Sequence, residues 1–249
     1  MDTAILIAQR LGKILLFSKV SDILSSIKDG SILKFKDREK AAHTLASVLK
    51  DSLKGASKED VTVIGIPRGG VIMAQVISQK IAAPSFDIVI SRKLSAPHNV
   101  ELGIGATMQD STLYLNDYVV NALKVSPEYI EQEKQKQIEE IKRRESLYRS
   151  SAKRYEIKGR IIVLVDDGAA TGATLVAAAR WIRKQEPKKL IIAIPVVPRE
   201  TLELLKKEAD HVEAVIIPIT TNFRSVGQFY EDFSPVSDED VMKIMKDQK

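Results

Sequence analysis

The sequence predicts an α/β fold, with an open, mostly parallel sheet covered by helices on both faces. The first observation is a set of short apolar runs without polar alternation, as expected for the buried strands of a parallel sheet. The second is that segments of helical spacing separate these runs, so that strands and helices alternate along the chain. The predicted strands are Val61–Ile66, Phe86–Ser91, Ile161–Val165, Leu190–Val196 and Val212–Ile217.

The composition is that of a globular protein. The chain has 249 residues, 44% of them hydrophobic, which suffices for one large α/β domain with appendages or for two small domains. Its formal charge of +5 suits a phosphate-rich ligand, although a charge of this size also serves solubility alone. The absence of cysteine excludes disulfides, thiolate zinc sites and cysteine nucleophiles, and it fits a reducing compartment. His43, His98 and His211 are too widely spaced for a recognisable metal cluster.

The sequence predicts neither a membrane segment nor a targeting signal. No apolar run approaches the roughly 20 residues that a membrane-spanning helix needs. The N-terminal stretch lacks a basic start, and Arg10 and Lys13 interrupt its apolar part, unlike in a signal peptide. We therefore expect a cytoplasmic protein without membrane contacts.

The first part of the chain is predicted to be helical. Residues 1–34 show only loose apolar periodicity, and we interpret them as a helical extension that packs on the core or contacts a second copy. The predicted core spans residues 35–218. Its first helix begins after Asp37, a typical N-cap residue, and carries apolar positions such as Ala41 and Leu45 at helical spacing.

A glycine-rich turn follows the first predicted strand. That strand runs directly into Pro67, Arg68, Gly69 and Gly70, and a helix is expected over residues 71–81. Backbone amides of such a turn, together with a helix N-terminus behind it, can bind an anion. The alternative is a tight turn with a solvent-exposed arginine. A second candidate anion loop later in the chain favours the anion site.

Two cations follow the next predicted strand. Arg92 and Lys93 come directly after Phe86–Ser91. Because the carboxyl ends of parallel strands meet at one edge of a sheet, we expect these cations to face the same crevice as the glycine-rich turn. The polar segment Ser95–Glu101, which contains His98, has no periodicity and is interpreted as a mobile loop.

Two insertions are predicted within the core. Residues 102–116 read as a β-hairpin, because two short apolar runs flank a polar turn. Gly103 and Gly105 do not complete a dinucleotide-binding fingerprint. Residues 127–155 are almost wholly polar or charged and predict a long surface helix. Its basic residues are interleaved with glutamates and lack a set of stacking aromatics, which argues against nucleic-acid binding.

The stretch IIVLVDDGAATGAT is the most informative part of the sequence. Asp166 and Asp167 come at the carboxyl end of the strand Ile161–Val165, and a helix over Leu175–Gln185 follows. The side chains between them are small, so a ligand can approach the backbone amides and the helix N-terminus. We interpret this stretch as a phosphate–ribose cradle. Its loop residues are Gly168, Ala169, Ala170, Thr171, Gly172, Ala173 and Thr174.

Residues 219–249 are predicted to form a small C-terminal cap. Phe223, Phe229 and Tyr230 cluster around Gly227. Such aromatic rings could stack on a planar base, each contact contributing about 1–3 kcal/mol. A hydrophobic cap over the core explains the same residues at least as well.

Three of these motifs together resemble a known family. The run VLVDDGAATGAT resembles the ribose-phosphate motif of the type I phosphoribosyltransferases. GIPRGG, at residues 65–70, is similar to that family's pyrophosphate loop, and Arg92 with Lys93 is similar to the basic pair after its next strand. The motifs occur in the family's order over roughly Phe35–Pro218. FKDREKAA, RKLSAP and VGQFYEDF extend the resemblance to a group of predicted phosphoribosyltransferases of unassigned substrate.

The resemblance implies a role for each motif. Asp166 and Asp167 would hold the ribose hydroxyls of phosphoribosyl pyrophosphate (PRPP), and residues 168–174 would bind its 5′-phosphate. Mg²⁺ would arrive with the ligand, with the same two carboxylates as candidate protein ligands. Asp166, Asp167 and Lys93 are the candidate catalytic residues. The pyrophosphate would be held by Pro67, Arg68, Gly69, Gly70, Arg92 and Lys93, the base would lie against Phe223, Phe229 and Tyr230, and His98 is the cation of the predicted mobile loop.

The implied function is Mg²⁺-dependent transfer of the phosphoribosyl group of PRPP to a nitrogenous base or related nitrogen nucleophile, with release of pyrophosphate. The alternative is a regulatory protein that senses PRPP or a nucleotide in the same pocket. The net positive charge and a loop whose only potential cation is His98 motivate this alternative. A phosphatase or hydrolase finds no supporting motif. We expect a homodimer, the commonest assembly of soluble proteins.

Overall fold

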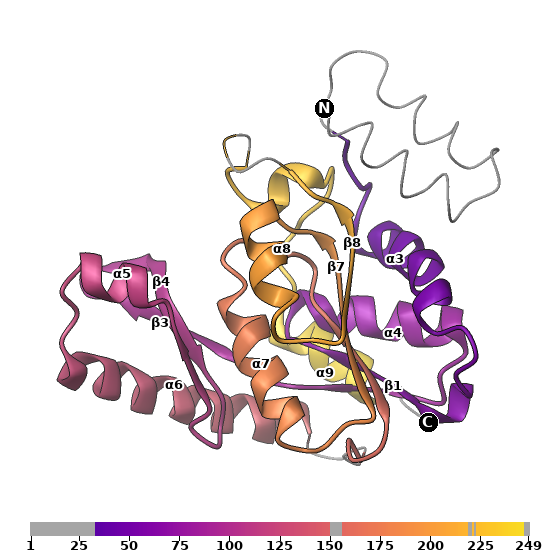
Figure 1. Ribbon diagram of the computed structural model, residues 1–249, viewed down its shortest axis with the longest axis horizontal. Coiled ribbons are helices and arrows are strands. Elements are labelled where there is room, and N and C mark those ends of the chain that lie inside the picture. Colours follow the sequence, from indigo (N-terminus) through magenta and orange to yellow (C-terminus); the bar gives the residue numbers. More distant parts are fainter. Residues whose placement is uncertain (1–32, 150–155, 219–220, 222, 247–249) are drawn as a thin grey trace.

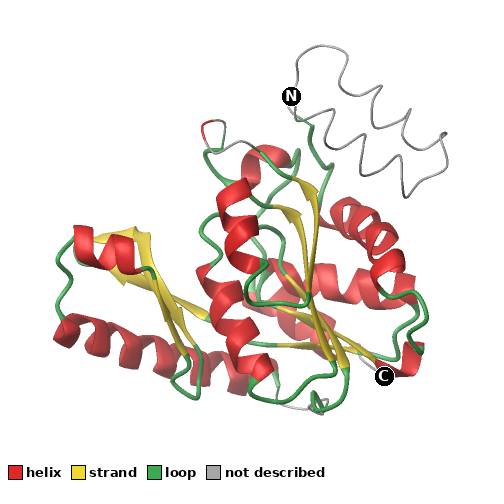
Figure 2. Ribbon diagram, viewed as in Figure 1, coloured by secondary structure: helices red, strands yellow, loops and turns green. Residues whose placement is uncertain are grey.

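The protein has an α/β fold built on a five-stranded parallel sheet, as the sequence predicts (Figures 1 and 2). The structure is a computed structural model that describes residues 33–149, 156–218, 221 and 223–246. The strand order is β2-β1-β6-β7-β8. The strands are β1 (Val61–Gly65), β2 (Phe86–Ile88), β6 (Ile161–Val165), β7 (Lys189–Val196) and β8 (His211–Ile216).

The strand order reverses between β1 and β6. From β1 the chain passes to β2 on one side, and it returns to place β6 on the other side, with Gly65 opposite Val165. In open parallel sheets the crevice at such a reversal is where ligands bind, beyond the carboxyl ends of the strands. The glycine-rich turn follows β1 and the acidic pair follows β6, so the fold brings both to this crevice.

Helices cover both faces of the sheet, and the two hydrophobic cores lie between the layers. One face packs against α3 (Arg38–Ser52), α4 (Gly69–Ile81) and α9 (Asp238–Lys246), and the other packs against α7 (Ala173–Arg183) and α8 (Arg199–Leu205) (Figure 1). Asp37 caps α3 as predicted, because its side chain accepts a hydrogen bond from the Lys40 amide. Short 3-10 helices η1 (Lys58–Asp60) and η3 (Val226–Phe229) complete this part of the fold.

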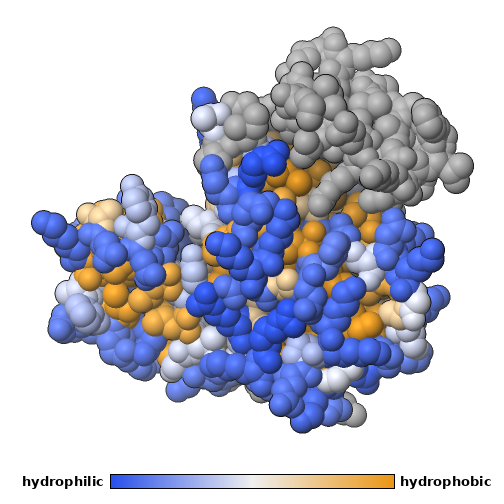
Figure 3. Space-filling model, in the orientation of Figure 1, coloured by the Kyte–Doolittle hydropathy of each residue, from blue (hydrophilic) through white to orange (hydrophobic). Residues whose placement is uncertain are grey.

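A separate lobe projects from the core (Figure 2). It consists of an antiparallel sheet, β3 (Arg92–Ala96), β4 (Asn99–Thr107) and β5 (Leu113–Leu115), with α5 (Asp117–Ala122) and α6 (Pro127–Tyr148). Space filling shows apolar surface on this lobe (Figure 3). The exposed large hydrophobic side chains of the described residues are Val100, Leu102, Tyr118 and Leu123, all in β4, in α5 or next to α5.

Two predictions for this lobe are wrong. The strand expected over Phe86–Ser91 ends at Ile88, and Ser95–Glu101 is not a loop but the meeting point of two paired strands. Only Pro97 and His98 form the turn between β3 and β4. Strand β3 has only five residues, and Pro97 follows directly after it. Its alternation of buried and partly exposed positions is too short to predict a strand from the sequence.

Helix α6 is long, as predicted, and it buries one face. Its buried side chains include Glu133, Gln137, Ile141 and Tyr148, which pack toward the lobe and the core. The helix ends at Tyr148, and residues 150–155 of the predicted helix lie outside the described part of the chain. The helix is therefore a structural link between the lobe and the core, not only a solvated surface.

The C-terminal segment is fastened to the start of the core. Phe35 and Tyr230 form a parallel bridge, and the Phe35 amide donates to the Phe229 carbonyl at 2.8 Å. The predicted extension at 1–34 and parts of the predicted cap at 219–249 fall on residues that the structure does not describe, namely 1–32, 219–220, 222 and 247–249. Among the described helices, none has the length and apolar character to cross a membrane.

Candidate functional site

The glycine-rich turn lies directly against the acidic pair. A Cβ atom added to Gly69 would lie 1.8 Å from Asp167 Oδ2, and one added to Gly70 would lie 2.7 Å from the Val165 carbonyl oxygen. Glycine is therefore required at both positions by close approach, not by chain flexibility. The peptide bond between Pro67 and Arg68 is cis. The turn and the acidic pair are thus in direct contact at the carboxyl ends of β1 and β6.

The loop after β6 leads into the N-terminus of α7. Its turn into α7 is made by Gly172, which has a φ of +73°, and the loop is braced from below by Thr201, whose hydroxyl donates to the Ala170 carbonyl at 2.6 Å. A Cβ on Gly168 would meet the side chain of Val226 at 2.3 Å. Ala170 and Thr171 are exposed. The first-turn amides of α7 have no acceptor within the helix and are available to an anion that approaches this loop.

Arg38 holds one of the two carboxylates. Its Nε donates to Asp167 Oδ2 at 2.7 Å, and both side chains are mostly buried. The guanidinium lies 4.0 Å from the centre of the Phe233 ring, and its Nη1 donates to the Ser234 carbonyl. Tyr230 supports the same residue, because its hydroxyl donates to the Asp167 backbone carbonyl at 2.7 Å.

Burial governs the protonation of the pair. Desolvation raises the pKa of Asp166 well above the usual value, and the neighbouring charge of Asp167 raises it further. Burial also raises the pKa of Asp167, although the Arg38 cation opposes this shift. Burial thus favours a proton on the pair, and a cation or a hydroxyl donor placed beside it would favour the charged carboxylates.

The structure separates the two cations that the sequence places side by side. Successive residues of a strand point to opposite faces, and Arg92 Nε donates to Gln137 of α6 at 2.9 Å whereas Lys93 Nζ donates to the Glu101 carbonyl at 3.0 Å. Burial lowers the pKa of Arg92, and the positive charges of Arg144 and Arg68 lower it further. Arg92 thus lies against α6, while the Lys93 ammonium is bonded within the small sheet.

Other predicted site residues lie elsewhere. Phe229 and Tyr230 are each only 3% exposed, in the core, so the prediction that they stack on a base is wrong for this conformation. Their rings pack on neighbouring aromatic side chains, Phe229 on Phe223 and Tyr230 on Phe35. Only Phe223 of the three is partly exposed. His98 is exposed in the β3–β4 turn, with a φ of +60°.

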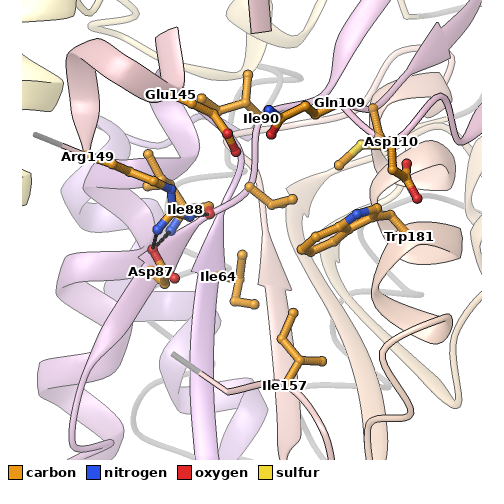
Figure 4. A pocket seen from close by; sticks show the side chains of 12 residues that line it. Ile64, Asp87, Ile88, Ile90, Gln109, Asp110, Glu145, Arg149, Ile157 and Trp181 are labelled. Atoms are coloured by element: carbon orange, nitrogen blue, oxygen red, sulfur yellow. Dashed lines mark hydrogen bonds and ion pairs between the residues drawn. The ribbon is translucent and has the colours of Figure 1, made fainter. Parts of the chain in front are cut away.

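A cavity of about 340 Å³ lies apart from this crevice (Figure 4). It opens beside the edge strand β2, between Trp181 of α7 and the C-terminal end of α6. Asp87 and Arg149 form an ion pair of 2.8 Å at its wall. None of the residues that the sequence proposes for the site lines it, within the described part of the chain.

Comparison with known proteins places the chain in a family. Residues 30–234 match the family model of the phosphoribosyl transferase domain. The chain belongs to this family. Two curated relatives, "Putative phosphoribosyl transferase MT0597" and "Putative phosphoribosyl transferase Rv0571c", come from two strains of Mycobacterium tuberculosis. Each is 35% identical over 211 residues, which cover 85% of this chain and 46% of the relative. This phosphoribosyl transferase domain therefore spans about half the length of the curated relatives it matches.

A solved structure supports the same fold. The crystal structure of TT1426 from Thermus thermophilus is 35% identical, with a TM-score of 0.68, and the match covers 86% of this chain and 98% of that chain. The family and the fold that the sequence predicts are therefore confirmed.

Four residues at or beside the crevice escaped the sequence analysis. They are Arg38, Arg143, Tyr148 and Asp238, which contact the acidic pair, the arginine of the glycine-rich turn, or one another. Arg38 is 129 residues away from its partner Asp167 in the sequence. No local spacing signals such a pair. The one sequence signal for Arg38 is that it lies in FKDREKAA, a segment that resembles other predicted phosphoribosyltransferases but to which no role is assigned.

Proposed function

We propose that this phosphoribosyl transferase domain transfers the phosphoribosyl group of PRPP to a nitrogenous base or a related nitrogen nucleophile and releases pyrophosphate. One observation carries the proposal. Gly69 approaches Asp167 so closely that the glycine-rich turn and the acidic pair bound a single crevice, with the N-terminus of α7 behind it. A ribose with anionic groups at both ends matches the spatial order of amides, carboxylates and cations along this crevice.

Different residues of the crevice would bind the ribose, the 5′-phosphate and the pyrophosphate of PRPP. The ribose hydroxyls would donate hydrogen bonds to Asp166 and Asp167. The 5′-phosphate would accept from amides of the loop 168–174, with the hydroxyls of Thr171 and Thr174 as further donors. The Ala169 amide is not one of these donors, because it donates to the Val196 carbonyl at 3.0 Å. The pyrophosphate would lie against the Gly69 amide, with Arg68 and Arg92 supplying charge. The Gly70 amide is already engaged, because it donates to the Ile66 carbonyl at 3.1 Å.

The crevice fits Mg²⁺ only together with the ligand. Within the described residues, no group of three or more acidic or histidine side chains could hold a metal ion. The pair of carboxylates supplies the hard oxygen donors that this ion prefers, and phosphate oxygens and water would complete its coordination. Asp166 and Asp167 would hold Mg²⁺, which would neutralise charge on the pyrophosphate.

The chemistry follows from where charge develops. Breakage of the bond between the anomeric carbon and the pyrophosphate oxygen leaves positive character on the ribose and negative charge on the leaving group. The two carboxylates stabilise the cationic sugar, and Arg68 and Arg92 stabilise the leaving anion. The acceptor nitrogen then forms the new bond to the anomeric carbon and loses its proton. No covalent enzyme intermediate is needed.

Binding of PRPP tests the assignment. We expect Asp166→Asn/Asp167→Asn to weaken PRPP binding at least about tenfold, because two charge-assisted hydrogen bonds to the ribose are lost. Isothermal titration calorimetry with and without Mg²⁺ measures the effect. Asp117→Asn, which changes an exposed carboxylate of α5, is the control. Undiminished binding in the double variant would refute the site.

A regulatory role is the second candidate, and one observation favours it. The ammonium of Lys93, a candidate catalytic cation, is engaged by the Glu101 carbonyl of the small sheet. A sensor would bind PRPP or a nucleotide without releasing pyrophosphate. A pyrophosphate-release assay across purines, pyrimidines and small amines separates the two, since turnover with any acceptor removes the sensor as the primary role.

The homodimer and the cytoplasmic location expected from the sequence are also proposals. The exposed side chains of Val100 and Tyr118 support a contact through the lobe. Light scattering of the full chain and of Val100→Glu/Tyr118→Glu tests this contact. We expect the mass of a dimer for the former and of a monomer for the latter.

A further inference from the structure

Three donors from two different elements converge on one carboxylate of the C-terminal segment. Asp238 accepts from the Tyr148 hydroxyl at 2.6 Å, and it pairs with Arg143 Nη2 at 3.3 Å and with Arg68 Nη1 at 3.5 Å. We call these four residues the Asp238 cluster. Two of the donors come from α6 and the third comes from the glycine-rich turn.

The Asp238 cluster borders the candidate site. Arg68 precedes Gly69, the residue that touches Asp167. Arg92 is held by Gln137 of the same helix α6 that carries Arg143 and Tyr148. Figure 1 shows α6 running from the lobe toward α9, and Arg143 and Tyr148 in its C-terminal half contact Asp238 at the start of α9. The pyrophosphate end of the proposed site therefore has α6 as one wall.

Positive charge exceeds negative charge along this wall. Arg144, one residue after Arg143, pairs with Glu140, and Glu140 also accepts from Arg143. These bonds lower the pKa of Glu140 to about 2, and bonds from Tyr148 and Arg143 lower the pKa of Asp238. Four arginines, Arg68, Arg92, Arg143 and Arg144, thus face three carboxylates, Asp238, Glu140 and Glu133.

The donors around Asp238 are those that a phosphoryl group requires. Two guanidinium groups and one hydroxyl present N–H and O–H donors to a single oxyanion, which is the arrangement found where proteins bind phosphate. The Asp238 and Arg143 side chains are 22% and 53% exposed. Ion pairs exposed to this degree stabilise a protein little, so a multiply charged anion can displace the carboxylate.

We propose that Asp238 is an internal stand-in for the pyrophosphate group, and that Arg143 and Tyr148 bind this group together with Arg68 once it has displaced Asp238. The inference rests on the proposed function and extends it to two residues of the inserted helix. It gives α6 a role in ligand binding. It also makes release of α9 from the glycine-rich turn a part of pyrophosphate binding.

Inorganic pyrophosphate with Mg²⁺ is the probe, titrated calorimetrically into the full chain. Arg143→Gln should weaken binding about tenfold and Tyr148→Phe about threefold, because each removes a donor. Asp238→Asn should tighten binding about three- to tenfold, because the competing charge is gone. The controls are Lys142→Gln and Glu239→Gln, exposed neighbours in sequence with the same changes in charge.

The sign of the Asp238→Asn effect decides the proposal. Weaker or unchanged binding in Asp238→Asn would show that Asp238 positions the arginines and does not compete with the ligand, and would overturn the inference. Changes in Arg143→Gln no larger than those in Lys142→Gln would also overturn it. Failure of the proposed function looks different: PRPP would then bind Asp166→Asn/Asp167→Asn as well as the unaltered chain, whatever the pyrophosphate data show.

Discussion

Gly69→Ala is expected to lower the affinity for PRPP about a hundredfold, since a misplacement of about 1 Å in a preorganised site has effects of this size. The added methyl group would lie 1.8 Å from Asp167 Oδ2 and 2.9 Å from Arg38 Nε. Neither side chain can move aside freely, because Arg38 and Asp167 form an ion pair with one another. The turn or the acidic pair must therefore move. The carboxylates that would bind the ribose are then displaced relative to the turn that would bind the pyrophosphate.

Gly103→Ala is the matched control for this prediction. A Cβ at Gly103 would lie 3.0 Å from the flexible side chain of Lys93. Its nearest backbone atom would be the Leu94 carbonyl oxygen, at 3.9 Å. Calorimetric titration with PRPP and Mg²⁺, and chemical denaturation of the same samples, separate loss of binding from loss of folding. We expect Gly69→Ala to stay folded, with the overpacking costing about 1–3 kcal/mol. PRPP binding by Gly69→Ala equal to that of Gly103→Ala would contradict the proposed crevice.

The local features of this site could be predicted from the sequence because each follows from a short segment. An apolar run identifies β1 or β6, and the residues after it must lie at the carboxyl edge of the sheet. Gly69 and the pair at Asp166 and Asp167 were assigned in this way. Their direct contact follows from the parallel pairing of β1 with β6, which places Gly65 opposite Val165.

The partners of those features could not be predicted, because they come from distant parts of the chain. Arg38 reaches Asp167 from the start of α3, and Asp238 reaches Arg68 from the last described helix. Burial of Tyr230 in the core likewise depends on its pairing with Phe35. The aromatic cluster alone does not distinguish a base-stacking surface from a hydrophobic cap.

The separation of Arg92 from Lys93 was within reach of sequence reasoning. Adjacent residues point to one crevice only if the chain is in a turn, whereas in a strand they point to opposite faces. The error in the end of the preceding strand, placed at Ser91 and not at Ile88, hid the start of β3. One misplaced boundary thus assigned Lys93 to the wrong surface.

Arg38→Gln is expected to destabilise the fold by about 3–5 kcal/mol near neutral pH, the range found when one partner of a buried ion pair is removed. The Arg38 and Asp167 side chains are 11% and 16% exposed, so water screens the pair poorly. Urea denaturation measures the loss. Arg38→Lys keeps the charge but not the planar group over Phe233, and it should recover part of the stability. Arg199→Gln, on the exposed start of α8, is the control.

The pH dependence of this loss identifies its cause. Burial raises the pKa of both Asp166 and Asp167 in the folded state, so the folded protein holds more protons than the unfolded chain above the ordinary carboxyl pKa of about 3.9. The contribution of this pair to the free energy of unfolding therefore falls as the pH rises from about 3.9 through the raised pKa values of the folded state. Arg38 opposes the shift in Asp167, and its removal should raise that pKa further and deepen the fall. The difference between Arg38→Gln and the unaltered protein should widen as the pH rises above the ordinary carboxyl pKa of about 3.9. A difference that stays constant with pH would assign the role of Arg38 to its packing on Phe233, and not to its charge beside Asp167.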